Sequence, residues 1–235
     1  MQSCDADGPT VNEATEPPPK PGPALVVAGL ERRHAPGTGI GPVDLVVPEA
    51  GRLSVTGPSG CGKSTLLRVI AGLEPADTGT IVIAGRNVER TLPGRRSVGL
   101  VEQHLPLYDH LDVTENVEMA VSGLRIDREE RRRRVAAALE VAEIGSFASR
   151  RAAMLSGGER ARTCLARLLA RRPAVALLDE PFAGLDRDLR DRVRRDTLDS
   201  LASAGVATVL VSHDDRDLDP DGRILEIDSG GRPIC

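Results

Sequence analysis

A glycine-rich segment near residue 60 carries the residue types that bind phosphate. Residues 57–65 fit the phosphate-loop pattern G-x-x-x-x-G-K-[ST] at every position. Its glycines let the backbone point several N–H groups at one anion, and the following helix adds partial positive charge. The alternative is a Gly/Ser turn that only caps a helix. We expect a phosphate-binding site formed by Gly57, Pro58, Ser59, Gly60, Cys61, Gly62, Lys63, Ser64 and Thr65.

Three side chains at the end of this loop have distinct expected roles. Lys63 supplies a mobile charge for the β- and γ-phosphates of a nucleotide. Ser64 offers a hydroxyl oxygen to Mg²⁺, and Thr65 assists at the phosphates. The sequence therefore predicts a nucleotide and Mg²⁺ as ligands.

Two adjacent carboxylates, Asp179 and Glu180, follow the apolar segment 174–178. Neighbouring side chains of a strand point in opposite directions, so the pair can serve two tasks. We expect Asp179 to hold Mg²⁺ through water, and Glu180 to act as general base toward a water that attacks the γ-phosphate. The alternative is a turn at a strand end with solvated acids.

Two further polar residues, Gln103 and His213, follow apolar segments. The amide oxygen of Gln103 can reach Mg²⁺ or the attacking water, although a solvated glutamine is equally compatible with the pattern. His213 can donate a hydrogen bond to the γ-phosphate, or it can be a structural histidine. Its place just past a buried strand favours the site, because ligands of open α/β sheets bind at the carboxyl ends of strands.

The segment Leu155-Ser156-Gly157-Gly158-Glu159 opens a helix that we expect to run to about residue 171. Ser156 is a suitable N-cap, and Glu159 stands where a capping-box partner would. The hydroxyl, the glycine N–H groups and the helix start also form a second anion cradle. One nucleotide needs only one such cradle on its own subunit. The segment is therefore either a well-capped helix or a surface that faces a nucleotide on a partner molecule.

Buried strands that alternate with helices must position these residues. This alternation predicts an α/β fold with a largely parallel sheet covered on both faces. Residues 114–154 show helical spacing without strand runs and are interpreted as a helical insert, in which residues 128–141 form one helix. Residues 188–203 form another expected helix, and residues 32–37 an expected loop. The expected strands are 24–28, 43–47, 53–56, 80–84, 97–101, 174–178, 206–211 and 223–227.

Composition bounds the class of protein. The chain has 235 residues, 40% of them hydrophobic and 28% charged, as is ordinary for a soluble globular protein. Its formal net charge of −4 argues against a general nucleic-acid binder. No apolar run approaches the length that spans a bilayer, so a membrane process would need the membrane part of another chain. The first 23 residues are rich in Pro, Glu, Asp and Thr and predict a disordered leader.

In this order, the motifs resemble the ATP-binding subunits of the ABC transporter family. The match covers nearly the whole chain after about residue 24 and includes the segment Ala183-Gly184-Leu185-Asp186 besides the residues above. The resemblance implies a P-loop NTPase core with a mostly parallel sheet, an N-terminal antiparallel β part and an inserted α-helical subdomain. After the leader 1–23, one ATPase domain, 24–235, would consist of a core (24–101 and 155–235) and a helical subdomain (102–154).

The resemblance also implies ligands and partners. Two ATP molecules would lie in a head-to-tail homodimer, each between the phosphate loop of one subunit and the Ser156–Glu159 segment of the other. Hydrolysis would power solute transport through integral membrane permease subunits, contacted near Tyr108, at the cytoplasmic face of the membrane. A solute-binding protein is a further implied partner, and nucleic acid is not. The implied catalytic residues are Glu180, His213, Gln103 and Lys63, and the implied Mg²⁺ ligands are Ser64, Gln103 and Asp179.

Three positions depart from the family pattern. His34 stands where an aromatic residue usually stacks on adenine, which puts base affinity or preference in question. Glu159 replaces the commonest glutamine at the end of its segment, and Glu102 replaces a frequent aromatic residue before Gln103. We therefore assign His34 to the base and expect Glu102 to alter the surface that contacts the membrane subunits.

The C-terminal part is similar to short importer ATPases of the thiamine-type group and uncharacterised relatives, so we favour import. An ABC exporter ATPase shares most of these features and stays open. A soluble ABC-type ATPase acting on nucleic acid or ribosomes is disfavoured, because the chain has no long insertion after the phosphate loop and only one such domain. Intact Lys63, Asp179, Glu180 and His213 also disfavour a catalytically inactive nucleotide sensor.

Overall fold

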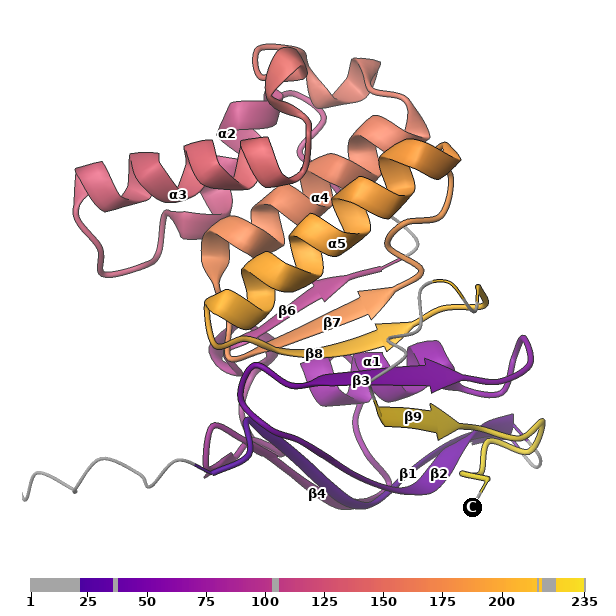
Figure 1. Cartoon of the computed structure of the whole chain (residues 1–235). Helices are drawn as coiled ribbons and strands as arrows, with labels where there is room; N and C mark the ends of the chain where they lie inside the picture. Colours follow the sequence, from indigo (N-terminus) through magenta and orange to yellow (C-terminus); the bar gives the residue numbers. More distant parts are fainter. Residues whose placement is uncertain (1–21, 36–37, 103–105, 215, 217–222, 235) are drawn as a thin grey trace, which may run out of the picture.

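The structure, a computed structural model, describes residues 22–35, 38–102, 106–214, 216 and 223–234 (Figure 1). Two sheets contain its named strands. A four-stranded antiparallel sheet has the order β2-β1-β4-β5, with β1 Leu25–Ala35, β2 Thr38–Val47, β4 Thr78–Ile83 and β5 Arg86–Asn87. A five-stranded parallel sheet has the order β6-β7-β8-β3-β9, with β6 Val98–Val101, β7 Val175–Asp179, β8 Ala207–Val211, β3 Arg52–Thr56 and β9 Arg223–Glu226.

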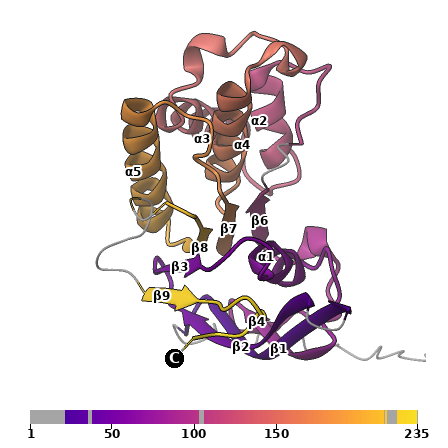
Figure 2. The same ribbon diagram turned by 90° about the vertical axis from the view of Figure 1, so that its right-hand side faces the viewer.

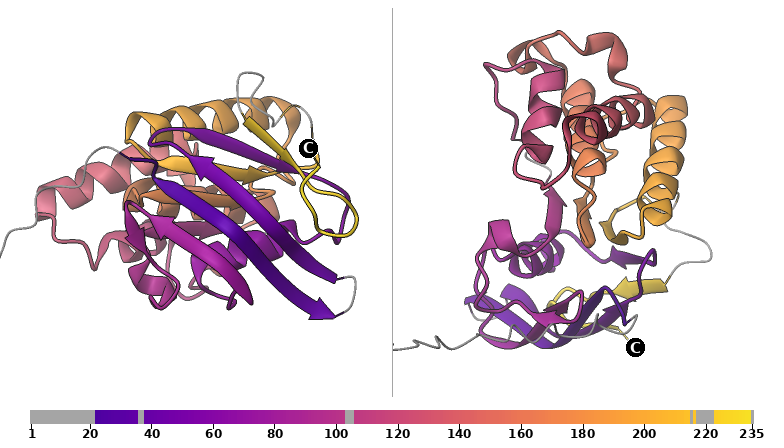
Figure 3. Two further views of the ribbon diagram at one scale, coloured as in Figure 1. Left: turned by 90° about the horizontal axis from the view of Figure 1, so that it is seen from below. Right: turned by 90° about the vertical axis from the view of Figure 1, so that its left-hand side faces the viewer.

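Helix α1 (Lys63–Ala71) lies between the two sheets (Figure 2). The alternation along β7 shows how the parallel sheet is covered on both faces. Val175 and Leu177 belong to the apolar core that contains α1 and the antiparallel sheet. Ala176 and Leu178 belong to the second core, formed with the helices on the other face. Seen from below, the antiparallel sheet lies in front of the parallel one (Figure 3, left). The expected fold class is confirmed.

Helices α2 (Val113–Val121) and α3 (Arg128–Val141) pack against α4 (Gly157–Arg171), and α5 (Arg187–Ser203) lies beside them (Figure 3, right). Two short 3₁₀ helices, Gly145–Phe147 and Ala152–Met154, lie between α3 and α4, and a third, Pro93–Arg95, precedes β6. The expected helices are confirmed, whereas the boundary between core and helical subdomain stays a prediction. Within the described ranges, none of the helices has both the length and the apolar character needed to cross a bilayer.

The expected loop at 32–37 is wrong over its described part. Strand β1 continues to Ala35, and Arg32 and Arg33 pair with Ile40 and Gly39 of β2. Asp77 supports this polar end of the strand: its carboxylate accepts hydrogen bonds from the Arg32 guanidinium at 2.8 Å and from the Arg33 backbone N–H at 2.7 Å. Apolar periodicity could not predict a strand whose side chains are held by ion pairs. The extension carries His34 toward the phosphate loop.

Candidate nucleotide-binding site

One cavity of about 510 Å³ collects half of the predicted residues. It opens where the parallel strands β3, β7 and β8 end, and α1 begins beside it. These strands are direct neighbours in the sheet, so residues far apart in the sequence meet at one edge. Its lining is Ser59, Gly60, Gly62, Lys63, Ser64, Thr65, Asp179, Glu180 and His213.

The backbone of residues 57–62 is shaped by glycine. Gly57, Gly60 and Gly62 have φ angles of 144°, 81° and 99°, which side chains rarely allow. Gly62 is the N-cap of α1, and no side chain accepts a hydrogen bond from the first turn of that helix. Helices α2, α3, α4 and α5 each begin with a capping side chain. The N–H groups at the start of α1 therefore remain for an anion in the cavity.

Lys63 lies across the loop and is 6% exposed. Its ammonium group donates hydrogen bonds to the backbone carbonyls of Gly57 and Pro58, each at 2.8 Å. Cys61 is buried in the core that contains α1 and does not line the cavity. A phosphate in this loop would meet a cation already held at its rim by the loop itself.

The two carboxylates at the end of β7 differ in environment. Asp179 is the last residue of the strand and is 9% exposed. Glu180 has a φ of 49°, and its carboxylate lies 3.1 Å from Nε2 of His213. Glu180 thus departs from the extended backbone of β7, which ends at Asp179. The structure brings both to the phosphate loop, and their separate roles stay predictions.

The turn that carries His213 is held by residues that the sequence analysis missed. Ser212 is buried, and its hydroxyl accepts a hydrogen bond from the Asp214 N–H at 3.0 Å. The Asp214 carboxylate accepts hydrogen bonds from Arg216 and also pairs with Arg190 of α5, which together hold the pKa of Asp214 well below its usual range. The charged residues that directly follow His213 were the available signal in the sequence.

His34 lies at the margin of the loop, with Nε2 3.4 Å from the Thr65 hydroxyl oxygen. Its side chain is half exposed, and it does not line the cavity. Gln103 and residues 1–21, most of the expected leader, lie outside the described residues. The assignments of His34 and Gln103 stay predictions.

The Ser156–Glu159 segment caps α4 and does not line the cavity. The Glu159 N–H donates to the Ser156 hydroxyl at 3.4 Å, and the Ser156 N–H donates to the Glu159 carboxylate at 2.7 Å. This second bond is the main reason why the pKa of Glu159 is lowered. The glutamate carboxylate accepts the bond that the side-chain oxygen of the commoner glutamine could also accept, so glutamate can replace glutamine at this position. The capped-helix alternative is thus present, and the role as a second anion cradle stays a prediction.

The donor set of the cavity fits Mg²⁺. The Ser64 hydroxyl and the Asp179 carboxylate line the same space. Among the described residues, no group of three or more His, Cys, Asp and Glu side chains is placed to hold a metal ion. Mg²⁺ does not need one, since it is usually bound by one or two protein oxygens, the phosphates of the substrate and water.

The fold and the cavity define an ATP-binding cassette: a phosphate loop, an acidic strand end and a histidine meet on a parallel sheet beside packed helices. The chain belongs to the family described as ABC transporter, whose model matches residues 40–183.

Relatives and solved structures agree with this assignment. The chain is 43% identical over 208 residues to "Sulfate/thiosulfate import ATP-binding protein CysA" of Mycobacterium tuberculosis (strain ATCC 25618 / H37Rv), covering 88% of this chain and 59% of the relative. It is 36% identical over 209 residues to "sn-glycerol-3-phosphate import ATP-binding protein UgpC 1" of Rhizobium etli, covering 89% and 60%. The chain thus spans about three-fifths of the length of these curated relatives.

Among solved structures, the chain is similar to the "ATP-binding cassette MJ0796 bound to ADP and Pi", described as a dimeric post-hydrolysis state. The TM-score is 0.80 at 28% identity, and the match covers 90% of this chain and 97% of the other. The expected membership of the ABC transporter family is therefore confirmed.

Proposed function

We propose that this chain is the ATP-binding and ATP-hydrolysing subunit that powers an ABC transporter, and that the transporter is an importer. The observation that carries the proposal is the single cavity in which Lys63, Asp179, Glu180 and His213 meet. Relatives named as import ATP-binding proteins for sulfate/thiosulfate and sn-glycerol-3-phosphate favour import. An exporter ATPase is the alternative. The thiamine-type subgroup is not named among these relatives and stays a prediction.

Each residue of the cavity has a proposed role. Lys63 and the start of α1 bind the β- and γ-phosphates, and Ser64, Asp179 and Gln103 hold the Mg²⁺ that neutralises charge on them. Glu180 takes a proton from the attacking water. His213 donates a hydrogen bond to the γ-phosphate, and the 3.1 Å between its Nε2 and the Glu180 carboxylate supports a shared position beside that phosphate. His34 contacts the base.

The proposed active unit is a head-to-tail homodimer. Ser156 and the glycines after it are absent from the lining of the cavity in their own subunit. The Cβ of a residue at position 157 would meet no atom within 4 Å, so this helix start is open to a ligand on another molecule. The dimeric state of the similar cassette supports this arrangement.

A second cavity, of about 360 Å³, is the proposed contact with a membrane permease subunit. It lies between β6, α2 and α4, and its lining includes Glu102 and Pro106, on either side of residues 103–105. Tyr108 and Met119 are exposed apolar side chains there, 43% and 46% accessible. A permease segment seated in this cavity would contact Glu102, which pairs with Arg68 of α1, the helix that begins at the phosphate loop. The chain would then act at the cytoplasmic face of the membrane, with a solute-binding protein as a further partner.

Phosphate release from Mg-ATP by the purified chain tests the proposal. Lys63→Ala should abolish ATP binding, because it removes the cation of the phosphate loop. Glu180→Gln should keep ATP binding and lower turnover by about 10²-fold or more, because the amide cannot accept the proton. The rate of phosphate release and the equilibrium affinity for ATP are measured for each variant and for the unaltered chain.

Glu140→Gln on the exposed surface of α3 is the matched control, since it makes the same chemical change away from the cavity. It should turn over ATP like the unaltered chain. Normal turnover by Glu180→Gln would mean that the base is another residue. An unaltered chain that neither binds nor hydrolyses ATP would overturn the proposed function itself.

A further inference from the structure

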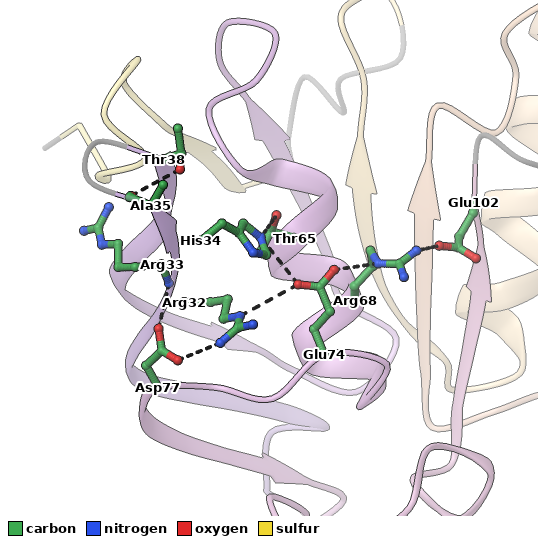
Figure 4. A network of polar contacts seen from close by, with 10 residues as sticks. All are labelled: Arg32, Arg33, His34, Ala35, Thr38, Thr65, Arg68, Glu74, Asp77 and Glu102. Atoms are coloured by element: carbon green, nitrogen blue, oxygen red, sulfur yellow. Dashed lines mark hydrogen bonds and ion pairs between the residues drawn. The ribbon is translucent and has the colours of Figure 1, made fainter.

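A network of charged side chains connects His34 to the end of β6, across α1 (Figure 4). Glu74, just after α1, is its centre. One carboxylate oxygen of Glu74, Oε1, accepts a hydrogen bond from Arg68 Nε at 2.7 Å. A guanidinium nitrogen of Arg68 also pairs with Glu102 at 2.5 Å. The Glu74 carboxylate is thus fixed from the side of α1 and β6.

The other oxygen of Glu74, Oε2, faces His34. It is buried and has no hydrogen-bond donor. Its nearest nitrogen neighbours are His34 Nε2 at 3.5 Å and Arg32 Nε at 3.9 Å, and Arg32 Nε is itself a buried donor without an acceptor. A buried acceptor without a donor is costly, and a small rotation of the imidazole would give it the Nε2 proton. The carboxylate therefore favours one orientation of the ring.

We propose that Glu74 is the positioning residue of the base site: held by Arg68, it presents its buried oxygen to His34 Nε2 and fixes the imidazole beside the phosphate loop. The inference rests on the proposed function, in which His34 contacts the base of ATP. His34 lies 3.4 Å from the hydroxyl of Thr65, the last residue of the loop, so a ring fixed there is next to a bound nucleotide.

The physical benefit is specific to histidine. An imidazole has a smaller face than a phenol or an indole and stacks less strongly on a base unless it is held in place or carries a proton. Glu74 meets the first condition, since its buried oxygen orients the ring. Arg32, Arg68, Asp77 and Glu102 are the other charges of this network: the arginines cannot accept a hydrogen bond, Asp77 accepts from Arg32 and the Arg33 N–H, and Glu102 pairs with Arg68. Glu74 is therefore the carboxylate that faces Nε2, beside the Thr65 hydroxyl.

The test compares the affinity for ATP with that for inorganic tripolyphosphate, which has no base. In Glu74→Gln the amide oxygen stays on Arg68 Nε, so the amide NH₂, which cannot accept, faces His34. This variant should weaken ATP binding about five- to tenfold, the loss expected for one stacking contact, and leave tripolyphosphate binding unchanged. His34→Ala should give a similar loss, and the double variant no further loss, because both changes remove one contact. In a His34→Tyr background, Glu74→Gln should have no effect, since a phenol ring does not need the carboxylate.

Asp77→Asn is the matched control. It makes the same change of charge in the same network, but Asp77 bonds to Arg32 and to the Arg33 N–H rather than to His34. It should bind ATP like the unaltered chain. Unchanged ATP affinity of Glu74→Gln, or an equal loss of tripolyphosphate affinity, would overturn the inference. Normal ATP turnover in the same preparations would leave the proposed function standing, so the two failures are distinguishable.

Discussion

Glu180 occupies a backbone conformation that its side chain does not favour, with a φ of 49°. The surrounding structure maintains it: the Glu180 N–H donates to the Val211 carbonyl at 3.0 Å, and the Ala183 N–H donates to the Glu180 carbonyl at 3.1 Å. Unfavourable backbone angles of this kind persist where neighbouring contacts over-determine them, and they are common at active sites. The strain marks the point where β7 ends and the chain turns into the cavity lining.

Gly62 shows how closely the phosphate loop is packed at its last turn. A Cβ at this position would lie 2.4 Å from the carbonyl oxygen of Gly39, a backbone atom of β2 that cannot move aside cheaply. We expect Gly62→Ala to lower the free energy of unfolding by about 1–3 kcal/mol and to weaken ATP binding, because the positive φ and the clash act together. Urea unfolding and ATP titration measure the two effects.

Gly60→Ala, two residues earlier, is the control for the clash. Gly60 also has a positive φ, but a Cβ there would meet nothing within 4 Å. It should lose only the conformational contribution, about 1 kcal/mol. Equal losses at both positions would show that the contact with β2 is not what requires glycine at position 62.

At the scale of elements, the sequence predicted those strands and helices whose buried positions are occupied by apolar residues. Strand β7 is buried throughout, and α3 buries Val135 and Leu139 at helical spacing, so both were recognisable. The ends of β1 and β2 were not, because Arg32 and Arg33 are held there by hydrogen bonds to Asp77, more than forty residues away. Contacts between distant charged side chains have no periodic signature in a single sequence.

The residues of the candidate site also divide into those that a local sequence pattern predicts and those that only the fold identifies. Its phosphate loop, acidic strand end and histidine have local patterns, and the parallel sheet brings them together. The residues that support these groups have no such pattern: Glu74 behind His34, and Arg190 beside Asp214. Their partners come from other elements, so only the fold identifies them.

Arg96 connects the end of α1 to residues 89–91, and the sequence did not indicate this contact. It is 6% exposed, and its guanidinium donates to the carbonyls of Val69 and Ile70 at the end of α1, at 3.0 and 3.1 Å. It also donates to the carbonyls of Thr91 and Glu89, at 2.9 and 3.1 Å. Burial lowers the pKa of Arg96, yet an arginine stays charged at neutral pH. A buried cation therefore caps the helix that carries the phosphate loop.

We expect Arg96→Ala to lower the free energy of unfolding by about 2–4 kcal/mol, because buried carbonyl groups would lose their donors. Arg96→Lys should recover only part of this loss, since an ammonium has three donors and cannot span the same carbonyls. The exposed neighbour Arg95 is the control, and Arg95→Ala should change stability by less than about 0.5 kcal/mol. Similar urea midpoints for Arg95→Ala and Arg96→Ala would contradict this account.

At the scale of the whole molecule, the starts of α1 and α4, the two anion cradles that the sequence predicts, differ in their surroundings. The start of α1 opens into the cavity with the catalytic candidates, whereas the start of α4 lies outside that cavity. A head-to-tail dimer would place each α4 start over the cavity of the other subunit. Each of the two sites would then contain residues from both chains. A site built from one chain alone could not be restored by mixing two inactive variants, whereas a shared site could.

Two inactive variants should restore activity when they are mixed. Lys63→Ala disables the phosphate loop but keeps the α4 start intact. Gly157→Asp places a negative charge at the α4 start, where a Cβ would meet nothing within 4 Å and an acidic residue is compatible with the first turn, so the fold should persist. A mixed dimer has one site made of the intact loop of one chain and the intact α4 start of the other.

Phosphate release from the equimolar mixture should reach about one quarter of the rate of the unaltered chain, because half of the dimers are mixed and each has one working site of two. Each variant alone should be nearly inactive. A mixture of Lys63→Ala with Glu180→Gln is the control, because both changes disable the same half of the site and no combination of the two chains repairs it. Equal inactivity of both mixtures, with intact folding of Gly157→Asp, would show that the α4 start does not complete the site of a partner subunit.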